Sequence, residues 1–196
     1  MINLFIDSSF VKLTVAISRD DLLIDFVSFD AWQCQSEYMI PEIDKLLTKN
    51  NLTAKDVGSI YVANGPGSYT GVRIAVSVAK VMGLALSIPI YTLSSLHIIK
   101  NGNHPSICLM NARSGRSYIG IYKGDEIILN DSIKTNEDVL ELIKKYSDFD
   151  LCGDAKHIGL EALETNVAQQ MVSLMKIATK VDDVLSLKPI YMKGQS

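Results

Sequence analysis

The sequence predicts an α/β fold of two lobes, and three observations support this class. Three short apolar runs separated by tight polar turns open the chain, which is typical of a strand meander. Two stretches with apolar residues at helical spacing follow, together with further short apolar runs. After residue 100 a shorter version of the same order begins, so two related layered units are expected.

The first three strands are expected at residues 2–6, 11–17 and 22–29. The first run ends at Asp7, and the second alternates apolar residues with smaller or polar ones. A charged turn at residues 19–21 separates the second run from the third. Short turns between sequential strands favour antiparallel pairing.

A helix is expected at residues 36–49, because apolar residues recur there on one face and charged residues lie away from it. Pro41 belongs in the first turn of this helix or at a kink, since proline removes one hydrogen bond. Residues 60–63 form a short buried strand that runs into the loop GPGSYTGVR. Residues 90–93 continue as another extended segment.

The helix expected at residues 70–86 is unusually apolar. Its polar residues Arg73, Ser77 and Lys80 make one narrow stripe, and nearly every other side is apolar. Such a helix is either buried in a core or covered by a partner.

The second lobe is expected from residue 101, where the composition changes to the loop signature NGNHPS. Strands are expected at residues 107–110, 118–122, 127–133 and 150–152, with helices at 136–146 and 165–180. The predicted division is residues 1–100 for the first lobe and 101–196 for the second. Apolar residues at 187–193 indicate that the C-terminal segment docks back on the first lobe.

The order β, β, β, α, β, α is that of a ribonuclease-H-like unit. Two such units, the second shortened, predict an actin-like ATPase fold, with two lobes of mixed sheets flanked by helices.

The composition of the 196 residues is that of a globular protein, with 47% hydrophobic and 21% charged residues. The formal net charge of −3 provides no basic surface for nucleic acid, because phosphate contacts need clustered Lys and Arg. RNA, if involved, would be held by another protein. The three cysteines are widely spaced, as in reduced proteins, and no basic leader or cleavage site is visible. We expect a cytoplasmic protein without membrane contact.

The loop GPGSYTGVR has two interpretations. Gly65, Gly67 and Gly71 allow backbone amides to approach a phosphate at the helix N-terminus, where the dipole favours an anion. Alternatively, the loop is a tight turn in which Ser68 or Thr70 caps the helix and the glycines permit close packing. The loop lacks the GK[ST] ending of a P-loop, which favours the tight turn.

Asp7 lies where an actin-like fold would hold a hydrated metal beside the phosphates of a nucleotide, although a lone carboxylate at a strand end is more often a turn residue. The matching turn of the second lobe offers Asn111 and two arginines in place of a second acid. Divalent metal binding is therefore weakly supported. A vestigial nucleotide site would comprise these residues: Asp7, Ser8, Gly65, Gly67, Ser68, Thr70, Gly71 and Asn111.

The sequence provides no recognisable catalytic or metal site. None of His97, His104 and His157 lies four residues from another, so zinc has no ligand set and a metallopeptidase is a remote alternative. No GxSxG elbow is present, and no histidine has a recognisable orienting partner. We therefore expect no catalytic residues, no bound metal and no cofactor of the chain's own.

Five motifs, in this order, resemble the TsaB family, also called YeaZ. These are IDSS at the first strand, GPGSYTGVR before the long apolar helix, MNARSGRSY opening the second lobe, LCGD, and KPIYMK near the end. Order and spacing match over essentially the whole chain, and GPGSYTGVR is the specific element. The family usually has an aspartate where this chain has Asn111 and a glutamate where it has Arg116. Older family names such as glycoprotease claim an activity for which the sequence has no residues.

The resemblance implies a non-catalytic scaffold that binds TsaD, the related subunit that performs threonylcarbamoyl transfer, and that acts with the small ATPase TsaE. The target would be adenosine 37 of tRNAs reading codons that begin with A, with ATP used by the complex and tRNA met through it. Family pairing packs the helices at 36–49 and 70–86 against TsaD, and the isolated chain could pair with itself. The interface residues expected on this basis are Met39, Ile40, Ile43, Leu47, Arg73, Val76, Ala79 and Lys80.

The competing hypothesis is a nucleotide-binding enzyme or sensor of the actin-like ATPase class. It would bind ATP or ADP between the lobes, using Asp7 and the glycine-rich loop. Binding of Mg-ATP by the isolated chain, lost on Asp7→Ala, would distinguish it from the scaffold.

Overall fold

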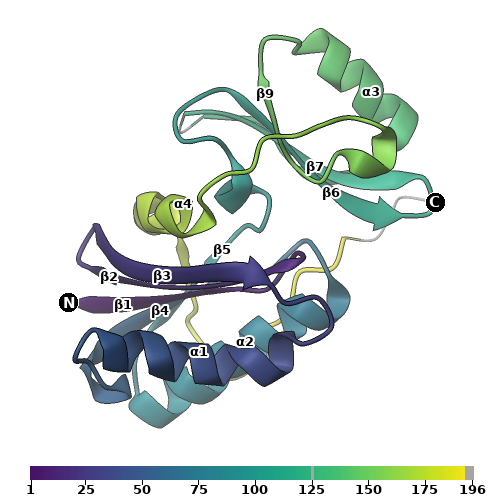
Figure 1. Ribbon diagram of the computed structural model, residues 1–196. Helices are drawn as coiled ribbons and strands as arrows, with labels where there is room; N and C mark the ends of the chain where they lie inside the picture. The colour runs from purple at the N-terminus through teal and green to yellow at the C-terminus, as the bar shows by residue number, and fades with distance from the viewer. Residues whose placement is uncertain (125, 193–196) are drawn as a thin grey trace.

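The first lobe of the computed structural model, which describes residues 1–124 and 126–192, is built on a mixed sheet with the strand order β10-β5-β4-β1-β2-β3 (Figure 1). The first three strands pair antiparallel, β4 and β5 continue parallel to β1, and β10 lies antiparallel to β5 at the edge. Their bounds are β1 (Ile2–Asp7), β2 (Lys12–Arg19), β3 (Leu22–Asp30), β4 (Val57–Ala63), β5 (Ile90–Leu93) and β10 (Thr179–Lys180).

Helices α1 (Gln35–Lys49) and α2 (Tyr69–Leu86) cover one face of this sheet, and α4 (Val167–Ser173) lies on the other (Figure 1). The strands alternate accordingly: Leu4 and Ile6 of β1 pack toward α1 and α2, while Phe5 packs toward α4. Because both faces are covered, every residue of β1 is buried.

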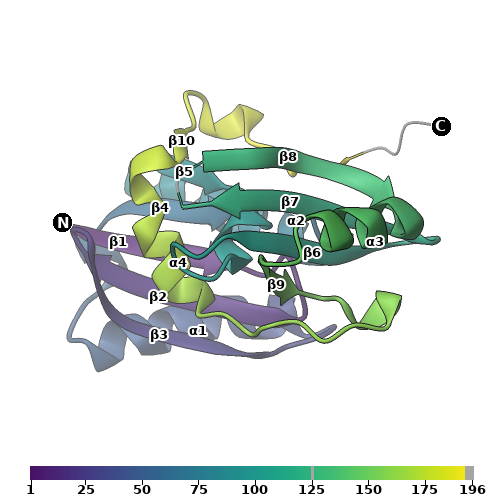
Figure 2. The same cartoon turned by 90° about the horizontal axis from the view of Figure 1, so that it is seen from above.

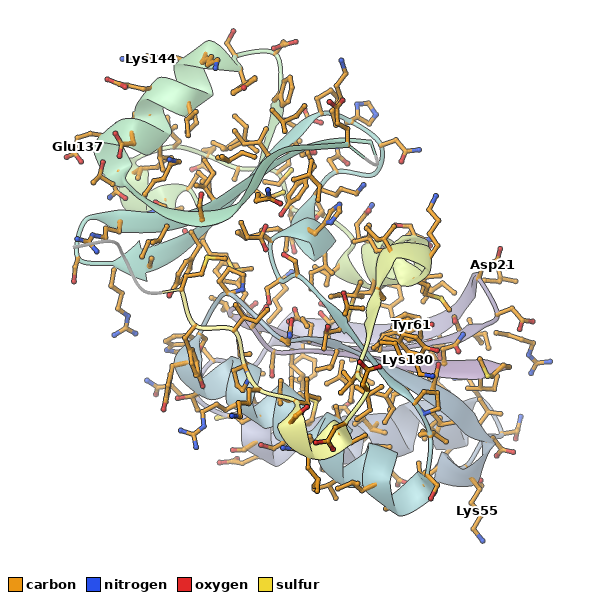
Figure 3. All side chains as sticks on the ribbon, turned by 180° about the vertical axis from the view of Figure 1, so that it is seen from behind. Asp21, Lys55, Tyr61, Glu137, Lys144 and Lys180 are labelled. Carbon is orange, nitrogen blue, oxygen red and sulfur yellow. The ribbon has the colours of Figure 1, made fainter. Side chains whose placement is uncertain are left out.

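The second lobe repeats this topology in shortened form. β6 (Ser106–Arg113), β7 (Arg116–Lys123) and β8 (Glu126–Thr135) form an antiparallel meander, and β9 (Asp150–Gly153) pairs parallel with β6 in the order β8-β7-β6-β9. Helix α3 (Asn136–Lys145) packs on this sheet through Val139 and turns its charged residues Glu137 and Lys144 outward (Figure 3). The actin-like, ribonuclease-H-like prediction is therefore confirmed.

Short 3-10 helices connect several of these elements. They are η1 (Ala54–Asp56), η2 (His97–Ile99), η3 (Lys156–Ile158), η4 (Met175–Ile177) and η5 (Val184–Ser186). Viewed from above, the second sheet lies over the first, with α4 between them at one end (Figure 2).

A stack of three aromatic rings supports the sheet face below α4. The Tyr61 ring, labelled in Figure 3, lies 5.0 Å from the Phe5 ring and 4.8 Å from the Tyr91 ring, centroid to centroid. One ring from each of β1, β4 and β5 therefore joins the stack.

One feature differs from the sequence prediction. The helix expected at 165–180 is the short α4 followed by η4 and β10; α4 packs in a cluster that includes residues of both sheets, and β10 joins the first sheet. The first lobe thus contains residues on both sides of the second in sequence. Pro41 lies inside α1, beyond its first turn.

Candidate functional site

The glycine-rich loop joins β4 to α2 as a capped turn. Ser68 is the N-cap of α2, and its Oγ accepts a hydrogen bond of 3.3 Å from the Gly71 amide. The Gly65 amide donates to Ser95 Oγ at 3.1 Å. These loop amides are therefore satisfied within the chain.

Gly67 and Gly71 allow the backbone of the turn after β1 to approach the loop closely. A Cβ on Gly67 would lie 2.2 Å from the carbonyl oxygen of Ser9, and one on Gly71 would lie 1.8 Å from that of Ser8. The Ser68 amide donates to Ser9 O at 2.7 Å, and Ser8 Oγ donates to Gly71 O at 2.8 Å. The turn after β1 thus occupies the surface that a phosphate would need, as the tight-turn interpretation predicts.

Gly65 faces the C-terminal segment in the same manner. A Cβ there would lie 2.5 Å from the Ile190 carbonyl oxygen, and the Ile190 amide donates to Asn64 O at 2.7 Å. Tyr191 then stacks on Tyr69 at 4.9 Å between ring centroids. The C-terminal segment consequently lies along the first lobe, beside α2.

Asp7 is buried at the end of β1, where its Oδ1 accepts a 2.8 Å hydrogen bond from the Ser9 amide. Burial raises the pKa of this carboxyl above its ordinary value, and the hydrogen bonds from Ser9 oppose the shift. Asp7 lines a cavity of about 470 Å³ between the lobes. Its charged lining residues are Asp7, Lys12, Asp154, Lys156, Glu161 and Glu164.

The charged lining of this cavity is mainly acidic. Carboxyl groups outnumber ammonium groups in its lining by four to two, and Lys12 forms an ion pair with Glu164. Asn111, expected to approach Asp7 from the second lobe, is exposed in the β6–β7 hairpin, accepts from the Arg113 amide at 2.7 Å and does not line the cavity. Across the described ranges no three His, Cys, Asp or Glu side chains gather as a metal site.

A polar cluster in the second lobe has no signal in the sequence. His157 Nε2 lies 2.7 Å from Ser117 Oγ, and its Nδ1 lies 3.8 Å from an Asp154 carboxylate oxygen. Ser117 Oγ also lies 3.0 Å from Asn136 Oδ1. His157 therefore has orienting partners, contrary to expectation, but Ser117 is fully buried, so no substrate reaches its hydroxyl. The cluster fastens η3 to β7.

The expected partner interface needs a correction. Five of its eight residues belong to the core under the first sheet: Met39, Ile43, Leu47, Val76 and Ala79. Helical spacing had placed Met39, Ile43 and Leu47 on an apolar face, and that face packs on the chain's own strands. Lys80 donates to two backbone carbonyls of the C-terminal segment, Leu185 O at 2.9 Å and Leu187 O at 3.3 Å. Ile40 and Arg73 remain exposed.

A second, outward surface remains on the same two helices. We call it the outer face, and its large apolar members are Ile40, Tyr69, Val81 and Leu84, which are 53, 59, 66 and 50% exposed. A groove of about 400 Å³ lies on it between α1 and α2, lined by Ser36, Tyr69, Thr70, Arg73, Ile74, Ser77 and Val78. By length and composition alone α2 could cross a membrane, but its inner side is packed on the sheet. The periodicity of the sequence located both helices but did not show which side of each helix is exposed.

The comparisons with known proteins agree over most of the chain. A family described as TsaD, tRNA N6-adenosine threonylcarbamoyltransferase, matches residues 30–181. The tRNA threonylcarbamoyladenosine biosynthesis protein TsaB of Bacillus subtilis is 34% identical over 151 residues, which is 72% of this chain and 66% of that protein, just under two thirds of its length. TsaB of Buchnera aphidicola from Schizaphis graminum is 29% identical, covering 72% of this chain and 74% of that protein.

Two further matches extend over nearly the full chain. The protein MG208 of Mycoplasma genitalium is 28% identical over 196 residues, covering 97% of this chain and 94% of its own length. Among solved structures, YeaZ from Pseudomonas aeruginosa has a TM-score of 0.79 at 19% identity, covering 97% of this chain and 99% of that one. At that identity the likeness shows the fold.

Proposed function

The chain belongs to the TsaB (YeaZ) family of tRNA threonylcarbamoyladenosine biosynthesis proteins, and we propose that it serves this modification as a non-catalytic subunit that binds TsaD. TsaD carries out the transfer of threonylcarbamoyl to adenosine 37 of tRNAs reading codons that begin with A. The chain acts as the scaffold of that reaction, in the cytoplasm and together with TsaE.

The outer face of α1 and α2 carries this proposal. Four large apolar side chains are at least half exposed there, on two adjacent helices. Exposed apolar area of this extent on neighbouring elements marks an interaction site, and a heterodimer buries about 800 Å² on each partner. Ile40 lies one helical turn beyond the groove residue Ser36, so both helices contribute to one contact surface.

The loop and the interlobe cavity support a role without chemistry of the chain's own. Backbone of the β1–β2 turn fills the glycine-rich loop, and acidic side chains outnumber lysines around Asp7. ATP would therefore be used by other members of the complex. With a net charge of −3, the chain meets tRNA through the complex.

Reconstitution tests the proposal directly. TsaD, TsaE, ATP, tRNA and the threonylcarbamoyl donor are combined with and without this chain, and modified adenosine 37 is measured. We expect transfer to require both TsaD and this chain, and neither to suffice alone. Transfer by this chain without TsaD would refute the non-catalytic role.

A matched pair of variants locates the surface. Leu84→Glu places a charge on the outer face, and Ile127→Glu places one at an equally exposed residue of the second lobe, both positions being 50% exposed. We expect Leu84→Glu to abolish stimulation of TsaD and Ile127→Glu to retain it. Equal activity of the two variants would exclude the outer face as the binding surface.

A second candidate function is nucleotide binding in the interlobe cavity, at Asp7. Calorimetric titration of the isolated chain with Mg-ATP measures it. Micromolar binding that is lost in Asp7→Ala would establish a nucleotide sensor, and no heat of binding would exclude it.

A further inference from the structure

The C-terminal strap, defined as residues 184–191, is held along α2 and the glycine-rich loop at three places. Lys80 Nζ donates to Leu185 O and Leu187 O, Leu187 is buried in the core, and the Ile190 amide donates to Asn64 O at 2.7 Å. Figure 3, seen from behind, shows the strap passing in front of α2. The strap is therefore a fixed part of the first lobe and not a loose tail.

The end of the strap builds a layered side-chain set at the start of α2. Tyr191 stacks on Tyr69 with ring planes 26° apart. The Arg73 guanidinium lies 5.2 Å from the centroid of the same Tyr69 ring, and its Nη1 donates to the Tyr69 hydroxyl at 2.8 Å. Tyr69 thus contacts both Tyr191 of the strap and Arg73.

Arg73 gives the groove a specific electrostatic character. Among the described residues that line the groove, Arg73 is the charged one, and the others are apolar or carry hydroxyl groups. A guanidinium has five N–H donors, and its bond to Tyr69 uses one of them. The remaining donors match a carboxylate, which arginine binds through two parallel hydrogen bonds.

We infer that the strap positions Arg73, through the Tyr191–Tyr69 stack, to bind a carboxylate of the partner protein. This inference rests on the proposed function, in which that partner is TsaD. A free arginine side chain loses rotamer freedom when it is fixed in an interface, and one already held in place loses less. Tyr191 is accordingly a positioning residue, and Arg73 is the residue that contacts the partner.

The glycine-rich loop and the strap depend on each other in this arrangement. Gly65 has a φ of +118° and leaves room for the Ile190 carbonyl oxygen, so the strap can reach the loop only because residue 65 has no side chain. The strap in turn delivers Tyr191 to the first residue of α2. The loop GPGSYTGVR therefore helps to form the partner-binding surface, because it accommodates the strap that carries Tyr191.

The test is the dissociation constant of the full-length chain for TsaD, measured by calorimetry. Tyr191→Ala should weaken binding several-fold and Arg73→Gln about tenfold or more, as for a central arginine of an interface. Tyr191→Phe keeps the ring and should bind like the wild type. Ile127→Ala, at a residue as exposed as Tyr191, controls for the loss of an exposed apolar side chain elsewhere, and unfolding midpoints establish that each variant is folded.

The double variant separates positioning from direct contact. In the Arg73→Gln background, Tyr191→Ala should have little further effect, because there is no guanidinium left to position. Unchanged affinity in Tyr191→Ala, or the same loss with and without Arg73, would overturn the inference while leaving the scaffold function intact. Failure of the wild type itself to bind TsaD would overturn both.

Discussion

The inner and outer faces of α2 are both apolar, yet they are built from different side chains. The buried positions of the inner face are glycine, alanine and valine, which let the helix lie close to the sheet: Gly71, Val72, Ala75, Val76, Ala79 and Gly83. The outer face carries Tyr69, Val81 and Leu84, of which Tyr69 and Leu84 are larger, around the hydrophilic Arg73 and Ser77. Small residues suit a closely packed core, whereas large exposed apolar residues contribute little to the stability of the isolated chain.

The comparison shows that apolar composition alone does not identify a partner surface. Helix α2 is apolar on two sides for two different reasons, one being its own core and the other the contact proposed with TsaD. Substitutions that place the same group on either side should therefore have opposite effects on stability and on binding.

Ala79→Glu should have the largest effect on stability. Ala79 is 0% exposed under the sheet, and an unpaired carboxylate there should lower the free energy of unfolding on the order of 4 kcal/mol, or prevent folding. Ala85→Glu makes the same substitution at an exposed position of the same helix and should change stability by less than about 0.5 kcal/mol. Urea denaturation of both proteins measures the difference, and equal midpoints would contradict the assigned inner face.

Gly71→Ala should have the second largest effect on stability. Its Cβ would lie 1.8 Å from the Ser8 carbonyl oxygen, which is backbone and cannot rotate away, so the turn after β1 must shift. We expect a loss of about 3 kcal/mol in the free energy of unfolding. Ser8→Ala removes the hydrogen bond to Gly71 O without the clash and should cost about 1 kcal/mol. A Gly71→Ala protein as stable as Ser8→Ala would show that the close approach is dispensable.

The fold was predictable because its signals are local. Alternating apolar residues, charged turns and the helical spacing of Met39, Ile43 and Leu47 each act over a few positions, and the repeated order of elements followed from them. The strand β10 was not predictable, since Thr179 and Lys180 form a strand only by pairing with Thr92 and Tyr91, almost 90 residues earlier. The same distance explains why Thr179 and Lys180 were assigned to a helix of the second lobe.

The candidate site was predictable only in part, for related reasons. The Ser68 cap is a local device and was among the two caps expected. What fills the loop comes from Ser8 and Ser9 on one side and Ile190 on the other, and no spacing in the sequence connects them. The sequence showed that the helix at 70–86 is apolar on nearly every side but could not tell whether the sheet or a partner covers Val76 and Ala79.

Asp7→Asn should have a smaller effect of opposite sign. Burial raises the pKa of Asp7 in the folded state, so the folded protein binds more protons than the unfolded chain between the ordinary value of 3.8 and the raised one. The stability contribution of Asp7 is therefore full below 3.8 and is lost as the pH rises through the folded pKa. An amide can still accept from the Ser9 amide, so Asp7→Asn should be more stable than the wild type at pH 7.

The pH dependence checks the cause of that gain. The advantage of Asp7→Asn in the free energy of unfolding should shrink as the pH falls toward 3.8. Asp21→Asn changes an exposed carboxylate at the β2–β3 turn and controls for the loss of one charge. An Asp7→Asn protein less stable than the wild type at pH 7 would mean that the ionised carboxylate has a stabilising partner in the cavity.

Leu84→Glu should have the smallest effect on stability and so completes the comparison. Leu84 is half exposed on the outer face, and its substitution should change the free energy of unfolding by no more than about 0.5 kcal/mol. Its affinity for TsaD should nevertheless fall by more than about tenfold, because a charge would enter an apolar part of the proposed contact. Circular dichroism melts and calorimetric titration separate the two quantities, and a large loss of stability with unchanged affinity would assign Leu84 to the core instead of the outer face.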